Sequence, residues 1–240
     1  METIIVTGAA GGIGREAVRA LARQDRRLVC VDIAEKALED LGAAASDLPG
    51  ETTLVLSRLE SVSACRQVVA KAGGDVAGLV HLAGVFEADD APLDDMGVYE
   101  RAIAHNLTNG YMMANAVFEK SLPERGGAMV FASSLAFRRG SWEHVPYAAA
   151  KGGLVGMTRA MARRFAPGWR VNAVAPGLID TAMPAKLIAE RGLEQVVREI
   201  PLKRLGEAAE VAGVIAFLMS PAATYVTGQC INVDGGIINS

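Results

Sequence analysis

The chain has 240 residues, 51% of them hydrophobic, so it can bury a substantial core without a metal ion or a disulfide to staple it. Its 24 basic and 27 acidic residues leave a net charge of −3, which argues against a nucleic-acid partner. The N-terminus lacks the pattern of a signal peptide, the three cysteines suit a reducing compartment, and no apolar run is long enough to cross a membrane, so we expect a cytoplasmic protein without membrane contact.

Short β-branched segments alternate with longer helical patterns along the chain. Strands are expected at 3–7, 27–33, 52–57, 75–83, 127–133, 169–175 and 229–234, and helices at 14–24, 61–72, twice between 94 and 122, at 147–166 and near 207–219. Strands that are apolar on both faces and separated by helices indicate a parallel sheet covered on both sides. Right-handed crossovers then favour an α/β, Rossmann-like, doubly wound sheet of about seven strands with helices on both faces.

A single domain over residues 1–240 is the simplest organisation, because the sequence contains no internal repeat, low-complexity tract or linker. Residues 178–206 differ from the rest of the chain, since they are rich in proline, methionine and charged residues and lack a strand pattern. Long excursions of this kind often act as binding loops or lids. We therefore expect 178–206 to leave the sheet as a substrate loop.

The segment TGAAGGIG (7–14) begins where the first expected strand ends and opens the first helix. Glycines at Gly8, Gly12 and Gly14 allow a tight turn whose backbone can approach a pyrophosphate at the helix N-terminus. The alternative is an ordinary tight turn between a strand and a helix. Asp32 favours the nucleotide site, because it ends the second strand 18 residues after Gly14, near the spacing of an acid that binds ribose hydroxyls.

A carboxylate at Asp32 accepts hydrogen bonds from a free 2′-hydroxyl and repels a 2′-phosphate. Neither Gly11 nor Ile33 is a basic residue that could neutralise such a phosphate. The sequence therefore predicts NAD rather than NADP. The alternative role for Asp32 is a solvated cap of the next helix.

The segment YAAAK (147–151) has the composition of a helix and places Tyr147 and Lys151 on the same face, one turn apart. A free phenol has a pKa of about 10. A nearby ammonium group, together with an oxidised nicotinamide, lowers that pKa, so that the tyrosine can take a proton from an alcohol as hydride leaves. Ser134 follows the strand 127–133 and could hold the substrate oxygen; a turn-forming serine is the alternative.

These segments together resemble the short-chain dehydrogenase/reductase family over essentially the whole chain. Those that match are TGAAGGIG, Asp32, HLAG (81–84), HNL (105–107), SSLA (133–136), YAAAK, PGLIDT (176–181) and VTGQCINVDGG (226–236). The resemblance implies a catalytic set of Asn106, Ser134, Tyr147 and Lys151, in which Tyr147 is the acid/base and Asn106 holds a water that relays protons to the lysine. It also implies that NAD is held by Gly8, Gly12, Ile13, Gly14, Asp32, Leu59, Ala83, Gly84, Tyr147, Lys151, Pro176, Gly177, Ile179 and Thr181.

Two positions depart from the family pattern. The usual Asn-Asn-Ala-Gly is His81-Leu82-Ala83-Gly84 here, and we expect the buried His81 to be structural. Arg58 stands where the family commonly has an aspartate that binds the adenine amino group, which weakens that contact and could help a 2′-phosphate.

The substrate pocket is expected to include Ser134, Trp142, His144 and Met183. The three histidines of the chain do not have the spacing of metal ligands, so no metal is expected. We expect an NAD(H)-dependent oxidoreductase that interconverts a secondary alcohol and a ketone. One alternative is an NADPH-dependent 3-oxoacyl-acyl-carrier-protein reductase, which the segment 201–220 resembles, and another is a non-catalytic nucleotide-binding sensor or scaffold. The family resemblance and the small residues of helix 147–166 imply a homotetramer or a homodimer.

Overall fold

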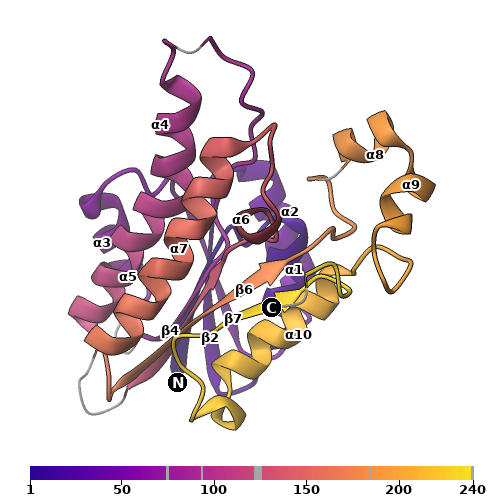
Figure 1. The fold of residues 1–240 in the computed structure, drawn as a ribbon. Helices are drawn as coiled ribbons and strands as arrows, with labels where there is room; N and C mark the ends of the chain where they lie inside the picture. Colours follow the sequence, from indigo (N-terminus) through magenta and orange to yellow (C-terminus); the bar gives the residue numbers. More distant parts are fainter. Residues whose placement is uncertain (74–75, 93, 122–125, 184, 239–240) are drawn as a thin grey trace.

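The computed structural model describes residues 1–240 except 74–75, 93, 122–125, 184 and 239–240 (Figure 1). Within this part of the chain, seven parallel strands form one sheet in the order β3-β2-β1-β4-β5-β6-β7. The strands are β1 (Glu2–Thr7), β2 (Arg26–Asp32), β3 (Glu51–Leu56), β4 (Val76–His81), β5 (Gly127–Ala132), β6 (Trp169–Pro176) and β7 (Cys230–Val233). The α/β doubly wound sheet that the sequence predicts is therefore confirmed.

Helices cover both faces of the sheet, and a hydrophobic core lies under each layer (Figure 1). One layer holds α3 (Val62–Lys71), α4 (Gly97–Ile103), α5 (Asn109–Lys120) and α7 (Val145–Arg164), and the other holds α1 (Gly12–Leu21), α2 (Glu35–Ala45) and α10 (Ala208–Met219). The strand β1 shows why the strands are apolar throughout: Ile5 faces one core while Ile4 and Val6 face the other. A parallel sheet buried on both faces requires this pattern.

Two features of the helices differ from the sequence-based expectation. The sequence-based prediction omits α2 and the short α6 (Ala136–Arg139), because few of their positions are buried. The two helices expected between 94 and 122 are one continuous helical stretch, since a π-helix (Ala104–Thr108) joins α4 to α5. A π-turn shifts the hydrogen-bond register by one residue and is frequent at functional sites.

Between β6 and α10 the chain leaves the sheet; that this segment is a substrate loop stays a prediction. This excursion contains α8 (Ala185–Arg191) and α9 (Leu193–Arg198), and the two helices stand apart from the sheet beyond the end of β6 (Figure 1). A parallel bridge between Ile179 and Gly206 closes its base. After α10, a 3₁₀ turn (Pro221–Ala223) leads to β7.

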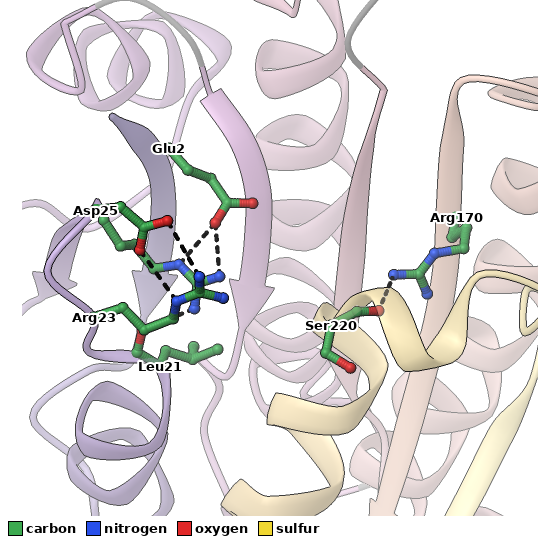
Figure 2. Close-up of polar contacts among 7 residues, drawn as sticks. Glu2, Leu21, Arg23, Asp25, Arg170 and Ser220 are labelled. Atoms are coloured by element: carbon green, nitrogen blue, oxygen red, sulfur yellow. Dashed lines mark hydrogen bonds and ion pairs between the residues drawn. The ribbon is translucent and has the colours of Figure 1, made fainter.

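The N-terminal ends of the strands are tied by charged side chains (Figure 2). Arg26, only 6% exposed, pairs with Glu2 at 2.6 Å and donates to the Leu21 carbonyl. Arg23 pairs with Asp25 at 3.1 Å, and Arg170 donates to the Ser220 carbonyl at 3.3 Å (Figure 2). These contacts serve the fold at the edge of the sheet opposite to the one where ligands bind in open α/β sheets.

Candidate active site

The end of β5 and the first turns of α7 are fastened together at the C-terminal edge of the sheet. The Ser133 hydroxyl donates to the Lys151 carbonyl at 2.8 Å, and the Lys151 ammonium donates to the Ala132 carbonyl at 2.9 Å. Ser133 and Lys151 are 3% and 4% exposed, so both hydrogen bonds are buried. These two bonds fix the position of α7 along β5, the strand that Ser134 follows.

The helix α7 brings Tyr147 and Lys151 together as the sequence predicts. Pro146 lies in its first turn, where its ring suits the helix start, and the alanines that follow favour helix. Tyr147 is 6% exposed, and the Lys151 ammonium nitrogen lies 5.4 Å from the centroid of its ring. Both side chains therefore face the interior, not the solvent.

Burial controls the charges of this pair. It lowers the pKa of Lys151 to about 8, because the ammonium is taken out of water. It also raises the pKa of Tyr147 above its usual value, and a hydrogen bond with the Ser134 hydroxyl offsets only part of this rise. In the protein alone, burial of the phenol is thus the larger effect; the expected lowering of this pKa by the lysine together with an oxidised nicotinamide stays a prediction.

Ser134 is placed where the sequence predicts, within hydrogen-bonding reach of the Tyr147 hydroxyl. Its own hydroxyl oxygen accepts from the Ala136 N–H at 3.1 Å, which starts the short α6. The turn-forming role and the proximity to the tyrosine thus coexist. The hydroxyl keeps a proton that it can donate to a third oxygen.

Asn106 lies in the π-helix, 1% exposed, and its side chain holds the segment after β4. Its amide nitrogen donates to the carbonyls of Val85 and Ala102, both at 3.0 Å, and its amide oxygen accepts from the Val85 N–H at 3.1 Å. Both amide hydrogens are therefore used in packing. A proton-relay water at Asn106 would therefore have to donate its hydrogen bond to the amide oxygen or to the backbone carbonyl oxygen of Asn106.

Gly84 shows how close Asn106 lies to Lys151. A Cβ atom built on Gly84 would be 2.5 Å from the Asn106 Oδ1 and 3.2 Å from the Lys151 Nζ. The backbone after β4 therefore fits between the two side chains only because it carries no side chain there.

The glycine-rich turn has the shape that an anion site needs. Gly8 has φ +66°, and a Cβ on Gly14 would overlap the Gly8 carbonyl oxygen. No side chain of the described residues caps the N-terminus of α1, and its first turn holds no acidic residue. The free N–H groups and the helix dipole thus favour a phosphate group at this turn, so these residues fit a dinucleotide.

Asp32 joins the turn to the end of β2. Its carboxylate accepts from the Ala10 N–H at 2.9 Å and from the N–H groups of Ile33 and Ala34 at 2.8 and 3.1 Å. The alternative role of Asp32, as a cap of the next helix, is wrong: α2 begins at Glu35 with Ala34 as its N-cap, and Asp32 makes no capping bond to it. The three bonds instead hold the carboxylate beside the glycine-rich turn. Arg15, one residue after Gly14, donates to the carbonyls of Ala10 and Ala37, so its guanidinium braces the same corner.

Arg58 and Leu59 lie beyond the end of β3. The Arg58 side chain is 74% exposed and lies 3.7 Å from the Glu60 carboxylate. Leu59 is 2% exposed and packs in the core with a left-handed φ of +57°, a conformation that leucine rarely adopts. Its backbone, not its side chain, is what a ligand could reach.

The segment after β6 reaches back to the glycine-rich turn. A Cβ on Gly12 would be 2.5 Å from the Thr181 Cγ2, and Gly177 lies against the backbone of Asp234. Ile179 is 5% exposed, and Thr181 donates its hydroxyl to the Ile179 carbonyl at 3.4 Å. The buried end of β6, Pro176, leads into this segment. Four of the residues expected to hold NAD, namely Pro176, Gly177, Ile179 and Thr181, thus belong to one segment that touches the turn.

The structure adds Phe86, which the sequence analysis missed. Its ring stacks on His144, with centroids 3.9 Å apart, and meets Tyr147 edge-on at 4.9 Å. The available signal was an aromatic residue two positions after HLAG, in the segment that follows β4. Of the other residues expected in the pocket, Trp142 is 84% exposed and Met183 is 53% exposed, so neither packs into this aromatic cluster.

Two kinds of feature are absent from the part of the chain that the structure describes. None of its helices is long and apolar enough to cross a membrane. Its His, Cys, Asp and Glu side chains form no group of three or more that could hold a metal ion.

Comparison with known proteins gives the family. A family model described as enoyl-(acyl carrier protein) reductase matches residues 8–238. The 3-oxoacyl-[acyl-carrier-protein] reductase FabG of Thermotoga maritima is 35% identical over 240 residues, covering 98% of this chain and 96% of the relative. A crystal structure of a single-residue variant of the actinorhodin polyketide ketoreductase with NADPH has a TM-score of 0.92 and 29% identity, covering 100% and 98% of the two chains. A 3-oxoacyl-[acyl-carrier protein] reductase with bound NAD from Brucella melitensis has a TM-score of 0.85 and 28% identity, covering 100% and 92%.

Matches over nearly the whole length, together with the sheet order and the residues at its C-terminal edge, identify this chain as a member of the short-chain dehydrogenase/reductase family and as an oxidoreductase that uses a nicotinamide cofactor.

Proposed function

We propose that this protein is an NAD(H)-dependent oxidoreductase that interconverts a secondary alcohol and a ketone. The observation that carries the proposal is the hydrogen bond between the hydroxyls of the buried Tyr147 and the half-buried Ser134, beside the buried ammonium group of Lys151. A phenol, a hydroxyl donor and a cation together can hold an alcohol oxygen and move its proton. When bound, the nicotinamide supplies the hydride chemistry, accepting hydride in one direction and returning it in the other.

In the direction of oxidation, Ser134 donates a hydrogen bond to the substrate oxygen while the Tyr147 oxygen removes the alcohol proton. The proton then leaves the tyrosine through Lys151, whose pKa of about 8 allows it to exchange protons near neutral pH. In the direction of reduction, Tyr147 gives its proton to the developing alkoxide. Each turnover thus removes one hydride and one proton from the alcohol, or in the reverse direction adds both to the ketone.

The raised pKa of Tyr147 fits a proton donor better than a base in the absence of further charge. Oxidised nicotinamide is positively charged, and an adjacent positive charge favours the phenolate. Lys151 contributes in the same direction. We therefore propose that the tyrosine becomes a base only in the complex with the oxidised cofactor.

For the cofactor we propose NAD, held by the glycine-rich turn (Gly8, Gly12, Ile13, Gly14), by Asp32, Leu59, Ala83 and Gly84, and by Pro176, Gly177, Ile179 and Thr181. The preference for NAD is supported by the Asp32 carboxylate, which is fixed beside the turn by three backbone N–H groups. Arg15 gives its guanidinium to two carbonyls, so it is poorly placed to receive a 2′-phosphate. Arg58, exposed and loosely paired, is the cation that could oppose this preference.

The test is turnover and binding with both cofactors. Purified protein with NAD and a panel of secondary alcohols should produce reduced cofactor, and NADP should give at least about tenfold lower kcat/KM. Tyr147→Phe should lower kcat by roughly a hundredfold or more while the Kd of NADH stays within about twofold. Normal turnover by Tyr147→Phe would overturn the mechanism.

A second candidate is NADPH-dependent reduction of 3-oxoacyl groups on acyl carrier protein. It is favoured by the 35% identity to a FabG from Thermotoga maritima. A 3-oxoacyl carrier-protein substrate turned over faster with NADPH than with NADH would select it. A non-catalytic sensor or scaffold is the third reading, and it is disfavoured because Asn106, Ser134, Tyr147 and Lys151 are all present at one site.

We also propose that the protein is cytoplasmic and forms one domain over its 240 residues. Its substrate is a small molecule, bound in a pocket that Trp142, His144 and Met183 help to line. We propose further that the protein assembles as a homotetramer or a homodimer. Exposed Tyr99, Tyr111 and Phe118 on α4 and α5 support the assembly, because they form apolar surface on the layer that also carries α7. Light scattering of the purified protein gives the mass; a monomer at micromolar concentration would contradict the proposal.

A further inference from the structure

His81 ends β4 and is 1% exposed, in a chain position where a histidine is a departure from the family pattern. Its ring reaches two other elements. The Nδ1 atom lies 2.8 Å from the Thr7 hydroxyl on β1, and the Nε2 atom lies 3.3 Å from the Asn109 Oδ1 on α5. The proposed mechanism gives this buried ring no role.

The partners of Asn109 fix the tautomer of His81. The Asn109 amide nitrogen donates to the His105 carbonyl at 2.7 Å, and its amide oxygen accepts from the Gly110 N–H at 2.7 Å. The amide orientation is therefore set by two backbone groups. Because an amide oxygen only accepts, His81 must carry its proton on Nε2, and its bare Nδ1 accepts the Thr7 hydroxyl proton. Burial lowers the pKa of His81 to about 4, so the ring is neutral at physiological pH.

The Asn109 side chain in turn supports the π-helix. The Asn109 N–H bonds to the Ala104 carbonyl five residues earlier, which is the register of a π-turn. The next carbonyl, His105, accepts from the Asn109 side chain. A histidine that orients this amide therefore stabilises the turn in which Asn106 lies.

Asn106 and Lys151 both lie against Gly84, so a shift of the π-helix moves one wall of the lysine site. A charge on His81 is also felt at Lys151, because the ammonium adds to the effect of burial in lowering the pKa of the ring. The contacts thus run from His81 through Asn109 and the π-helix to the proton-transfer site, although His81 touches none of the reacting atoms of that site.

We propose that His81 is a positioning residue for proton transfer: as the neutral Nε2–H tautomer it orients Asn109, which holds the π-helix and keeps Asn106 in place beside Lys151. This inference rests on the proposed function. It goes beyond that function by giving the histidine of HLAG a specific task and by naming the atom that performs it.

Two amide substitutions distinguish the two hydrogen bonds of the His81 ring, one made by Nδ1 and the other by Nε2. In His81→Gln the amide lies near the position of Nε2 and can donate to Asn109, whereas in His81→Asn it lies near the position of Nδ1 and can contact only Thr7. His81→Phe keeps the ring and removes both hydrogen bonds. Val80→Ala is the matched control, because Val80 is fully buried on the same strand but faces the other core.

We expect His81→Phe and Asn109→Leu each to lower kcat roughly tenfold to a hundredfold, with the Kd of NADH and the KM of the alcohol within about threefold of wild type. The double variant should lose no more than either single variant, since both break one chain of contacts. His81→Gln should restore most of kcat and His81→Asn should not. Val80→Ala should lower the unfolding midpoint and leave kcat unchanged.

Three results would overturn the inference. The losses of kcat in the two single variants could multiply in the double variant, or His81→Gln and His81→Asn could restore kcat equally. The third such result is a kcat that falls in step with the unfolding midpoint across the variants. A long-range ¹H–¹⁵N spectrum of the histidine rings gives a readout that needs no activity: a proton on Nδ1 of His81 at neutral pH would contradict the assigned tautomer. A wild-type protein without turnover would count against the proposed function instead, whereas an active wild type with a fully active His81→Phe would count against this inference alone.

Discussion

The Arg139 guanidinium on α6 donates to the Glu199 carboxylate at 2.8 Å and so joins the helix after Ser134 to the end of α9. Arg191 of α8 donates to the same carboxylate. The two arginines hold the pKa of Glu199 below its usual value, Arg139 having the larger effect. This cluster connects the excursion 178–206 to the segment that carries the proposed substrate-oxygen donor.

Glu199→Gln should loosen this connection without harming the fold. The pair is partly exposed, so its loss should change the free energy of unfolding by less than about 1 kcal/mol. We expect the KM of the substrate to rise about two- to fivefold at low salt, kcat to stay within about twofold, and the difference to shrink near 1 M salt. Steady-state kinetics at several ionic strengths measures this.

The matched control for Glu199 is Glu194→Gln. Glu194 lies in α9, the helix that Glu199 follows, but pairs with Arg198 one turn away within that helix. It should leave KM unchanged at every salt concentration. Equal effects of the two variants would show that the excursion is not held through Glu199.

Gly84→Ala should disturb the site through a single methyl group. The added Cβ would lie 2.5 Å from the Asn106 Oδ1, closer than real contacts allow, and 3.2 Å from the Lys151 Nζ, a tight contact, so the Asn106 side chain or the backbone must shift. Because proton transfer depends on placement within about an ångström, we expect kcat to fall roughly a hundredfold. Gly213→Ala is the control, since a Cβ there meets no described atom within 4 Å, and it should raise the free energy of unfolding by about 1 kcal/mol. Equal kcat in the two variants would contradict the prediction.

The parts of the site that sequence predicts well are those set by local spacing. Tyr147 and Lys151 share a face because they are one helical turn apart, and the turn through Gly8 and Gly14 needs glycine for steric reasons within a few residues. The apolar strands predict the parallel sheet for the same kind of reason, because the residues of one strand are enough to show that both of its faces are buried.

The parts that sequence does not predict depend on contacts between distant segments. The stacking of Phe86 on His144 joins two loops that are 58 residues apart, and no spacing rule encodes it. The burial of Tyr147 belongs here too: spacing shows the nearby cation but not the depth of burial, which raises the pKa of the phenol in the protein alone. The π-helix was missed because its register shift has no compositional signal.

Lys151→Met should trade activity for stability. Burial lowers the pKa of Lys151 from 10.5 to about 8, so below pH 8 the folded protein bears the full cost of an ammonium group away from water. After subtracting the lost hydrogen bond to Ala132, we expect the variant to gain about 1–2 kcal/mol in free energy of unfolding at pH 7. Urea unfolding at constant ionic strength measures the gain, and turnover should be lost.

The sign of the pH dependence follows from proton binding. Between about pH 8 and 10.5 the unfolded wild type holds the lysine proton and the folded wild type has released it, so wild-type stability rises with pH in this window. The advantage of Lys151→Met should therefore shrink from about pH 7 to about pH 9.5. Lys71→Met, at an exposed position on α3, should show neither a gain nor a trend. A gain that stays constant with pH would refute burial as the cause.

Asp32→Ala should change cofactor choice and stability together. The carboxylate accepts from three backbone N–H groups, and leaving them without an acceptor should lower the free energy of unfolding by about 1–3 kcal/mol. Loss of the proposed hydrogen bonds to the ribose should weaken NAD binding about tenfold or more, and loss of the negative charge should tighten NADP binding. Isothermal titration with both cofactors, at a temperature where each variant is folded, gives the two Kd values.

The control for Asp32 is Glu35→Ala, which removes an exposed acidic side chain three residues further along, in the first turn of α2. It changes the net charge equally, so any general electrostatic effect on a phosphate should appear in both variants. We expect the ratio of the NADP to the NAD Kd to fall by about two orders of magnitude in Asp32→Ala and by less than about twofold in Glu35→Ala. A ratio that is unchanged in Asp32→Ala would mean that the carboxylate serves only the turn, and the proposed preference for NAD would then have to be attributed to another residue of the site.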